Sequence, residues 1–344
     1  MMSSYAASIG LLPTDPVFWV PMLLLFLTGI MVLGTIVFDG FDMGVGLLLP
    51  FAPVQYRQAL MTSLSPWRSV NETWVLLTFA LAVAAFPFAF STILNHLYLP
   101  MLLCTVGVVT RSIAFEFRAR SAPPMRSFWL IMYGVGSFLS AFGLGLILAA
   151  FVTGYQQDAT NLVFILFVTV CAMAACVLMG SCLLIIQWQG EVRQLAARWG
   201  IHAVRWVAAG MTAVSIMLAM ANPAILYKWT HIDNLIPAGM LWTLMLACFV
   251  WVEIYFKGIR AQRIQGKFWL PFVLCVILLG LMLLGMVYSL FPFLVLDEVT
   301  LWDAVPSASS MRIILAAILI VMPVIVLRHL SNYRLIFSPS GVRL

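Results

Sequence analysis

The chain has 344 residues, of which 64% are hydrophobic and only 9% are charged. Soluble domains carry about 25% charged residues, so this chain has too few charges to cover a water-facing surface. Apolar segments long enough to cross a hydrocarbon core of about 30 Å recur along it, which predicts a polytopic α-helical membrane protein and excludes a soluble enzyme, a secreted disulfide scaffold and a disordered tail. The net charge of +6 is dispersed over short loops, a pattern that indicates membrane topology rather than nucleic-acid binding.

Nine apolar segments are predicted to form transmembrane helices. In chain order they cover residues 18–38, 74–97, 99–117, 127–153, 162–186, 205–226, 235–257, 268–294 and 312–328. Cytoplasmic loops should hold the excess of Lys and Arg, and with the N-terminus outside, fifteen of the 18 positive residues fall on the inner side. Only Lys228 and Arg312 fall outside, and Arg111 lies within the third span. We therefore expect an all-α integral membrane protein with nine transmembrane helices, an outer N-terminus and an inner C-terminus, in which residues 1–344 form one polytopic domain.

Two carboxylates, Asp39 and Asp42, stand at the end of the first predicted span. Charged groups at membrane depth are costly and therefore mark functional sites. At a spacing of three residues the two side chains share one face if the helix continues, and there they could pass protons or contact a polar ligand. The alternative is an Asp-Gly helix stop, in which Gly40 lets the backbone turn. The sequence leaves both interpretations open.

Ser69 and Glu72 precede the second predicted span and also allow two interpretations. Their spacing is that of a capping box, in which the Glu72 carboxylate satisfies a backbone amide at the start of the helix. Alternatively, Glu72 carries protons near the cytoplasmic side, and Ser69 holds water in a hydrogen-bonded chain. The candidate residues for a proton path are therefore Asp39, Asp42, Ser69 and Glu72.

A third polar set, Arg111, Glu116 and Arg118, lies at the inner end of the third predicted span. Charges inside a membrane usually pair, so Glu116 could pair with a neighbouring Arg and lose most of its burial cost. We expect a structural ion pair at this place.

Cysteine and histidine form no predicted metal or haem site. All six cysteines lie inside apolar segments, without a C-x-x-C pair, as buried apolar side chains do. The histidines fall at span ends or in loops, whereas a haem inside the bundle needs an axial ligand within a span; they are His96, His202, His231 and His329. We expect this chain to bind no metal and no cofactor directly. Two classes remain: an ion-coupled secondary transporter, which should show broken helices in matching positions of two halves, and a subunit of a larger membrane enzyme whose partner holds the cofactors.

Five motifs occur in one order along the chain. They are Asp39-Gly40-Phe41-Asp42-Met43-Gly44-Val45-Gly46 ahead of Leu49-Pro50-Phe51, Asn71-Glu72-Thr73-Trp74, Ala85-Phe86-Pro87, Leu97-Tyr98-Leu99-Pro100, and Arg111 with Ala114-Phe115-Glu116-Phe117-Arg118. A later segment adds Thr300-Leu301-Trp302-Asp303-Ala304 with Pro306 and Ser309-Ser310. In order and spacing these motifs resemble subunit II of cytochrome bd-type quinol oxidases, including the cyanide-insensitive branch. The resemblance covers residues 39–118 and 286–325, and the middle of the chain is similar only in hydropathy.

This resemblance implies a fold and an assembly. The fold would be two four-helix bundles plus one peripheral helix, with the first bundle at about 18–153 and the second bundle and extra helix at about 162–328. The obligate partner would be a subunit I in a bacterial inner membrane that carries haem b and haem d, oxidises quinol near the outer face and reduces oxygen to water. Subunit II in that family binds no haem, contributes a cytoplasmic proton path and in some members holds a structural quinone. A small single-helix subunit, quinone and lipid are further expected partners, and nucleic acid is not.

One motif departs from the family. The family has Trp-Asp-Gly before the Asn, where this chain has Arg68-Ser69-Val70 with Trp67 one place earlier. Because the Asp is a proton-path residue in the family, Glu72 or the two earlier aspartates would take the carboxylate role here; alternatively, the partner carries b-type haems only. The polar residues expected to support the fold or to contact the partner subunit are Trp67, Arg68, Asn71, Arg111, Glu116, Arg118, Trp302 and Asp303.

Overall fold

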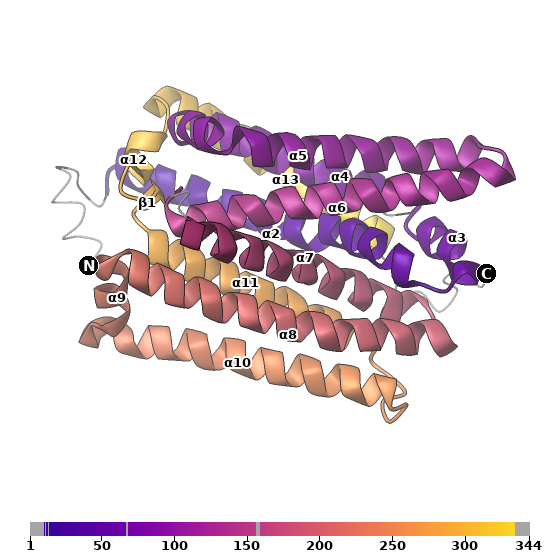
Figure 1. Ribbon diagram of the computed structural model, residues 1–344. Helices are drawn as coiled ribbons and strands as arrows, with labels where there is room; N and C mark the ends of the chain where they lie inside the picture. The colour runs from indigo at the N-terminus through magenta and orange to yellow at the C-terminus, as the bar shows by residue number, and fades with distance from the viewer. Residues whose placement is uncertain (1–9, 11, 13, 67, 156–158, 334–344) are drawn as a thin grey trace.

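Long helices run side by side along most of the chain (Figure 1). The computed structural model describes residues 10, 12, 14–66, 68–155 and 159–333. Two short strands, β1 (Phe293–Val295) and β2 (Val299–Thr300), form an antiparallel hairpin. The helices are α2 (Pro16–Leu48), the 3-10 turn η1 (Leu49–Phe51), α3 (Val54–Thr62), α4 (Arg68–Ala85), α5 (Pro87–Arg120), α6 (Pro123–Thr153), α7 (Ala159–Gln187), α8 (Gly190–Ala221), α9 (Pro223–Thr230), α10 (Ile232–Arg260), α11 (Leu270–Leu290), α12 (Leu301–Ala304) and α13 (Ala308–Tyr333).

Eight helices in the described part of the chain are long and apolar enough to cross a membrane. They are α2, α5, α6, α7, α8, α10, α11 and α13. The prediction of a multi-pass helical membrane protein is thereby confirmed. Helix α4, with 18 residues, is the remaining candidate for a ninth span, and the count of nine, the orientation and the grouping into two bundles plus one helix stay predictions.

The first predicted span is too short at its C-terminal end. We expected it to end at residue 38, but α2 continues to Leu48. The Asp-Gly dipeptide therefore does not stop this helix, and the helix-stop interpretation of Asp39 and Asp42 is wrong. The glycines that suggested a turn lie instead where other helices come close to α2.

The second predicted span, residues 74–97, has the wrong bounds at both ends. Helix α4 already begins at Arg68, and it ends at Ala85 because Pro87 follows. Proline lacks the amide hydrogen that a continuing helix needs, but it suits the first position of a new helix. Pro87 accordingly begins α5, which includes residues 87–97 and bends at Leu97, where the backbone is not helical.

Helix α2 lies between several neighbours and contacts α4, α6 and α7. Its contact with α7 is made by backbone, because Gly44 and Gly180 face each other there. A Cβ at Gly44 would overlap the carbonyl of Cys176, and a Cβ at Gly180 would lie 2.7 Å from the carbonyl carbon of Gly44. Small residues allow this close approach of helices in a membrane.

Helix α8 follows α7, and a second proline ends the helical path after it. Helix α8 ends at Ala221, and Pro223 begins the short helix α9. The Asn222 side chain caps α9, because its Oδ1 accepts a hydrogen bond from the amide of Ala224 at 2.9 Å. This break and the hairpin β1–β2 lie near one end of the helices (Figure 1).

The contact between Gly44 and Gly180 generates a prediction about stability. Gly44→Val should lower the yield of monodisperse protein and its thermal midpoint, because overpacking a tight contact costs about 1–3 kcal/mol. Gly29→Val is the matched control on the same helix, since no atom lies within 4 Å of a Cβ at Gly29. Size-exclusion chromatography and a thermal scan in detergent measure both variants. Equal losses in the two would contradict the packing argument.

Candidate functional site

A buried ion pair joins α2 to α5. The guanidinium of Arg111 donates a hydrogen bond to the carboxylate of Asp39, and the two side chains are 1% and 2% exposed. Helix α2 positions Asp39 because it continues past Gly40, and α5 positions Arg111 one helix away. Each charge makes the burial of the other tolerable, because an unpaired charge in a membrane would be far more costly.

Asp42 lies on the same face of α2, and its hydrogen-bond partners among the described residues are neutral. Asn71 of α4 donates a hydrogen bond from Nδ2 to Asp42 Oδ1 at 3.4 Å, and the hydroxyl of Tyr133 donates to the Asp42 backbone carbonyl at 3.2 Å. Asp42 is 1% exposed, and its Oδ2 accepts no hydrogen bond from the described residues. Because no ion pair depends on Asp42, it could gain or lose a proton without leaving a cation unpaired.

Glu72 and Arg68 form a second pair, one helical turn apart on α4. Arg68 donates from Nη2 and Nε to Glu72 Oε1, at 2.5 and 3.0 Å. Ser112 of α5 donates to the same oxygen at 2.8 Å. The Glu72 side chain is 31% exposed, whereas Arg68 is buried, with its guanidinium 4.3 Å from the centre of the Phe115 ring. The cluster thus reaches from buried Asp42 to a carboxylate with solvent-accessible surface.

The capping-box interpretation of Ser69 and Glu72 is wrong. Helix α4 begins at Arg68, so Ser69 lies inside the helix, exposed, and its carbonyl accepts a hydrogen bond from Thr73 Oγ1. The Glu72 carboxylate is bound to side chains rather than to the start of the helix. Trp67, a candidate contact residue, lies outside the described residues.

Glu116 does lie beside a neighbouring arginine, as expected, but this arginine is Arg120 and the pair is exposed rather than buried. Arg111 and Arg118 are two turns apart and share the buried face of α5, whereas Glu116 points away from that face. Its side chain is 63% exposed and lies 3.7 Å from Arg120. Arg118 instead donates from Nη1 to Gln58 Oε1 of α3 at 3.0 Å.

Trp302 and Asp303 lie far from this cluster and shape the segment before α13. The Asp303 carboxylate accepts a hydrogen bond from Thr300 Oγ1 at 2.5 Å in a capping box that begins α12. Trp302 donates from Nε1 to the Phe18 carbonyl at 3.1 Å and stacks on the Phe18 ring, with centroids 5.3 Å apart. These contacts fasten the hairpin end of the chain to the start of α2.

Sequence reasoning missed one buried histidine. We placed His329 at a span end, but α13 extends to Tyr333, and His329 is only 5% exposed. Its Nδ1 accepts a hydrogen bond from Trp74 Nε1 at 2.9 Å, and its ring lies 3.9 Å from that of Phe38. Trp74 stands in a recognised motif, but no spacing in the sequence linked it to a residue so distant in the chain.

Among the described residues, the buried His329 does not fit a haem ligand. Its Nδ1 accepts the hydrogen bond from Trp74, so the neutral ring carries its proton on Nε2 and has no second lone pair for an iron atom. The described residues contain no group of three or more His, Cys, Asp or Glu side chains that could hold a metal ion.

Comparison with known proteins identifies the family. A family model described as cytochrome bd terminal oxidase subunit II matches residues 20–336. A curated relative from Bacillus subtilis, cytochrome bd ubiquinol oxidase subunit 2, is 29% identical over 136 residues, which are 39% of this chain and 40% of that protein. Cytochrome bd-I ubiquinol oxidase subunit 2 from Escherichia coli K12 is 28% identical over 118 residues, 34% of this chain and 30% of that protein.

The fold comparison agrees with the family match. A chain of the bd oxidase structure from Geobacillus thermodenitrificans superposes with a TM-score of 0.75 and 15% sequence identity, covering 93% of this chain and 99% of that chain. The curated relatives align over less than half of their length, so the family assignment rests on the match across residues 20–336. This chain therefore belongs to the cytochrome bd terminal oxidase subunit II family.

Proposed function

We propose that this chain is the haem-free subunit II of a bd-type terminal quinol oxidase in a bacterial inner membrane. Its obligate partner would be a subunit I that carries haem b and haem d, oxidises quinol and reduces oxygen to water. The other class that the sequence allowed was an ion-coupled transporter. The family to which the chain belongs does not favour this class. Quinone, lipid and a small single-helix subunit are further partners that the resemblance suggests.

The observation that carries this proposal is the charged cluster across α2, α4 and α5. The motifs that resemble the family supply its members, Asp39, Asp42, Asn71, Glu72 and Arg111. In the assembled oxidase the haems of subunit I would supply electron transfer and oxygen reduction. The residues of this chain would hold and move protons.

A cytoplasmic proton path fits the different environments of the three carboxylates. Glu72 has accessible surface and would take up a proton at the edge of the cluster. To do so, its carboxylate must first lose the hydrogen bonds from Arg68 and Ser112. Asn71, the neighbour of Glu72 in sequence, contacts Asp42. Asp42 could hold the proton within the bundle because its partners are neutral. Asp39 would keep its negative charge, because protonation of Asp39 would leave the charge of Arg111 without a partner.

The test of the proposed function is a spectrum of the assembled complex. The chain, produced together with subunit I and purified in mild detergent, should give reduced-minus-oxidised bands of haem and should consume oxygen when quinol is added. A pure complex of this chain that contains no haem and leaves quinol unoxidised would contradict the proposal and favour the transporter.

Asp39 and Asp42 should differ in what their loss affects. Asp39→Asn leaves Arg111 buried without its counter-charge, which typically costs about 3–5 kcal/mol, so the yield of assembled complex should fall. Asp42→Asn keeps an oxygen for Asn71 but cannot titrate, so the complex should assemble with normal haem content and turn over at least roughly tenfold slower.

Oxygen uptake per haem, measured in both variants, separates assembly from turnover. Glu116→Gln is the matched control, an exposed carboxylate on α5 outside the cluster, and it should change neither quantity. Wild-type turnover by fully assembled Asp42→Asn enzyme would remove Asp42 from the path.

Glu72 is tested by removing its charge with and without that of Arg68. Glu72→Gln alone abolishes proton exchange and also unpairs Arg68, so slower turnover could have either cause. In Arg68→Gln/Glu72→Gln no charge is left unpaired. If Glu72 carries protons, the double variant should stay at least roughly tenfold slower than wild type in oxygen uptake per haem; recovery would assign Glu72 to the ion pair alone. Ser69→Ala should behave as wild type, because Ser69 is exposed and caps nothing.

A further inference from the structure

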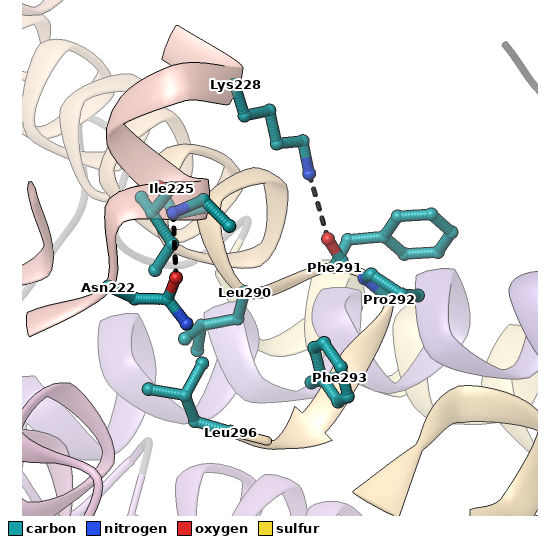
Figure 2. Close-up of a pocket in the computed structure, with 10 residues that line it drawn as sticks. Asn222, Ile225, Lys228, Leu290, Phe291, Pro292, Phe293 and Leu296 are labelled. Carbon is teal, nitrogen blue, oxygen red and sulfur yellow. Dashed lines mark hydrogen bonds between the residues drawn. The ribbon is translucent and has the colours of Figure 1, made fainter.

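A cavity lies at the end of the bundle where α9 meets the end of α11, far from the charged cluster in sequence (Figure 2). Its volume is about 340 Å³, within the range of small-molecule sites. Side chains from four segments line it, among them Asn222, Ile225, Lys228, Leu290, Phe293 and Leu296. The proposed proton path uses none of these residues.

The wall of this cavity is almost entirely apolar. Ile225 and Leu290 belong to a small hydrophobic cluster under α9, together with Val152, Leu218 and Leu296. Figure 2 shows Leu290 and Leu296 beneath Ile225, with Pro292 and Phe293 beside them. Such a wall favours a hydrocarbon chain over a polar solute, because burying apolar surface is the dominant gain available there.

The polar residues of the lining are Asn222, Ser289 and Lys228. Lys228 is the residue among them that can carry a charge, and its side chain extends from α9 toward the Phe291 carbonyl (Figure 2). Its Nζ donates hydrogen bonds to the carbonyls of Tyr288 at 2.6 Å and Phe291 at 2.9 Å. Nζ also lies 4.5 Å from the centre of the Tyr288 ring and 5.6 Å from that of the Phe291 ring. An ammonium has three donors, and the described residues provide two hydrogen-bond acceptors and these two rings. Burial lowers the pKa of Lys228, so its charge lacks the full compensation that water would give.

Lys228 is expected to lie on the outer side of the membrane. The distribution of Lys and Arg predicts that this end of the bundle faces outside, where positive residues are scarce. Lys228 and Arg312 are the two cations assigned to the outer segments. Asn222, which also lines the cavity, donates to the carboxylate of Asp297 at 3.3 Å, and among the described residues no ion pair joins that carboxylate to Lys228.

We propose that this cavity binds an acyl chain of an anionic phospholipid from the outer leaflet, with the lipid phosphate on the remaining donor of Lys228. The apolar wall provides the site for the chain, and the cation at its edge selects the headgroup. Basic pockets between transmembrane helices bind anionic headgroups on the cytoplasmic side of membranes, and the same attraction between a cation and a phosphate applies here. This lipid site does not depend on the proposed oxidase activity, because its test measures lipid binding.

Native mass spectrometry of the full chain, purified with the subunits that accompany it and stripped of lipid, gives the affinity directly. Phosphatidylglycerol should bind several-fold more tightly than phosphatidylcholine, because the positive choline group of phosphatidylcholine would be repelled by Lys228. Lys228→Met should weaken phosphatidylglycerol binding at least about tenfold, the loss expected for one hydrogen bond to a charged group. Lys228→Arg should retain most of the affinity, since it keeps the charge.

Three further variants separate a built site from surface charge and from misfolding. Arg312→Met removes the other outer cation, which is exposed and lines no part of the cavity, and should leave binding unchanged. Ala224→Trp fills the cavity from its exposed edge while Lys228 and its two carbonyl partners remain, and should abolish binding. Leu226→Trp, on the same helix but outside the lining, should bind as wild type.

Several outcomes would overturn the proposal. Equal losses in Lys228→Met and Arg312→Met would show an effect of surface charge only. Unchanged binding in Ala224→Trp would place the lipid elsewhere. Competition by sn-glycerol 3-phosphate as strong as that of the intact lipid would show a phosphate site without a chain, and tighter retention of an uncharged prenyl quinone than of phosphatidylglycerol would assign the cavity to a different ligand.

Discussion

The cost of an unpaired charge inside a bilayer governs the first half of this structure. Arg111 and Asp39 are buried almost completely, so α5 and α2 must keep the separation at which their side chains meet. Helix α6 packs closely beside this pair, because a Cβ at Gly136 would lie 2.6 Å from the amide nitrogen of Arg111. The ion pair and the glycine contacts therefore support each other. The ion pair determines which helices are neighbours, and the glycines let these helices approach until the two side chains meet.

The same constraint distributes different roles to three nearby carboxylates. Asp39 is bound to a cation, and Asp42 has neutral donors and a buried oxygen without a hydrogen bond from the described residues. Glu72 lies at the edge and shares one oxygen between Arg68 and Ser112. A group that must move protons cannot also be the permanent counter-charge of a buried cation. Within the proposed proton path, Asp42 is therefore a better candidate than Asp39 for the carboxylate that gains and loses a proton, a distinction that residue type alone does not make.

The sequence predicted the membrane class, eight of the helices and the shared helix face of Asp39 and Asp42, because these follow from local hydropathy and helical periodicity. It misplaced the end of α4, although Pro87 was visible, because the apolar segment continues beyond the proline. Hydropathy measures whether residues tolerate lipid and does not detect a change of direction.

Tertiary partners were beyond the reach of local patterns. Glu116 was expected to form the ion pair at the inner end of the third predicted span, but the buried pair there joins Arg111 to Asp39 on another helix. The proximity of Glu116 along the chain was misleading, because helical rotation places it on the opposite side. His329 was missed for the same reason: its contact with Trp74 joins α13 to α4, which lie far apart in the sequence.

The hydrogen bond between Trp74 and His329 has a consequence for the chemical form of the imidazole. An indole N–H can only donate, so Nδ1 of His329 must offer a lone pair, and the ring proton of the neutral form belongs on Nε2. An imidazolium carries a proton on both nitrogens and would have to give up the indole. The hydrogen bond between α13 and α4 therefore requires one tautomer of the neutral imidazole. Protonation of His329 would break this bond between the two helices.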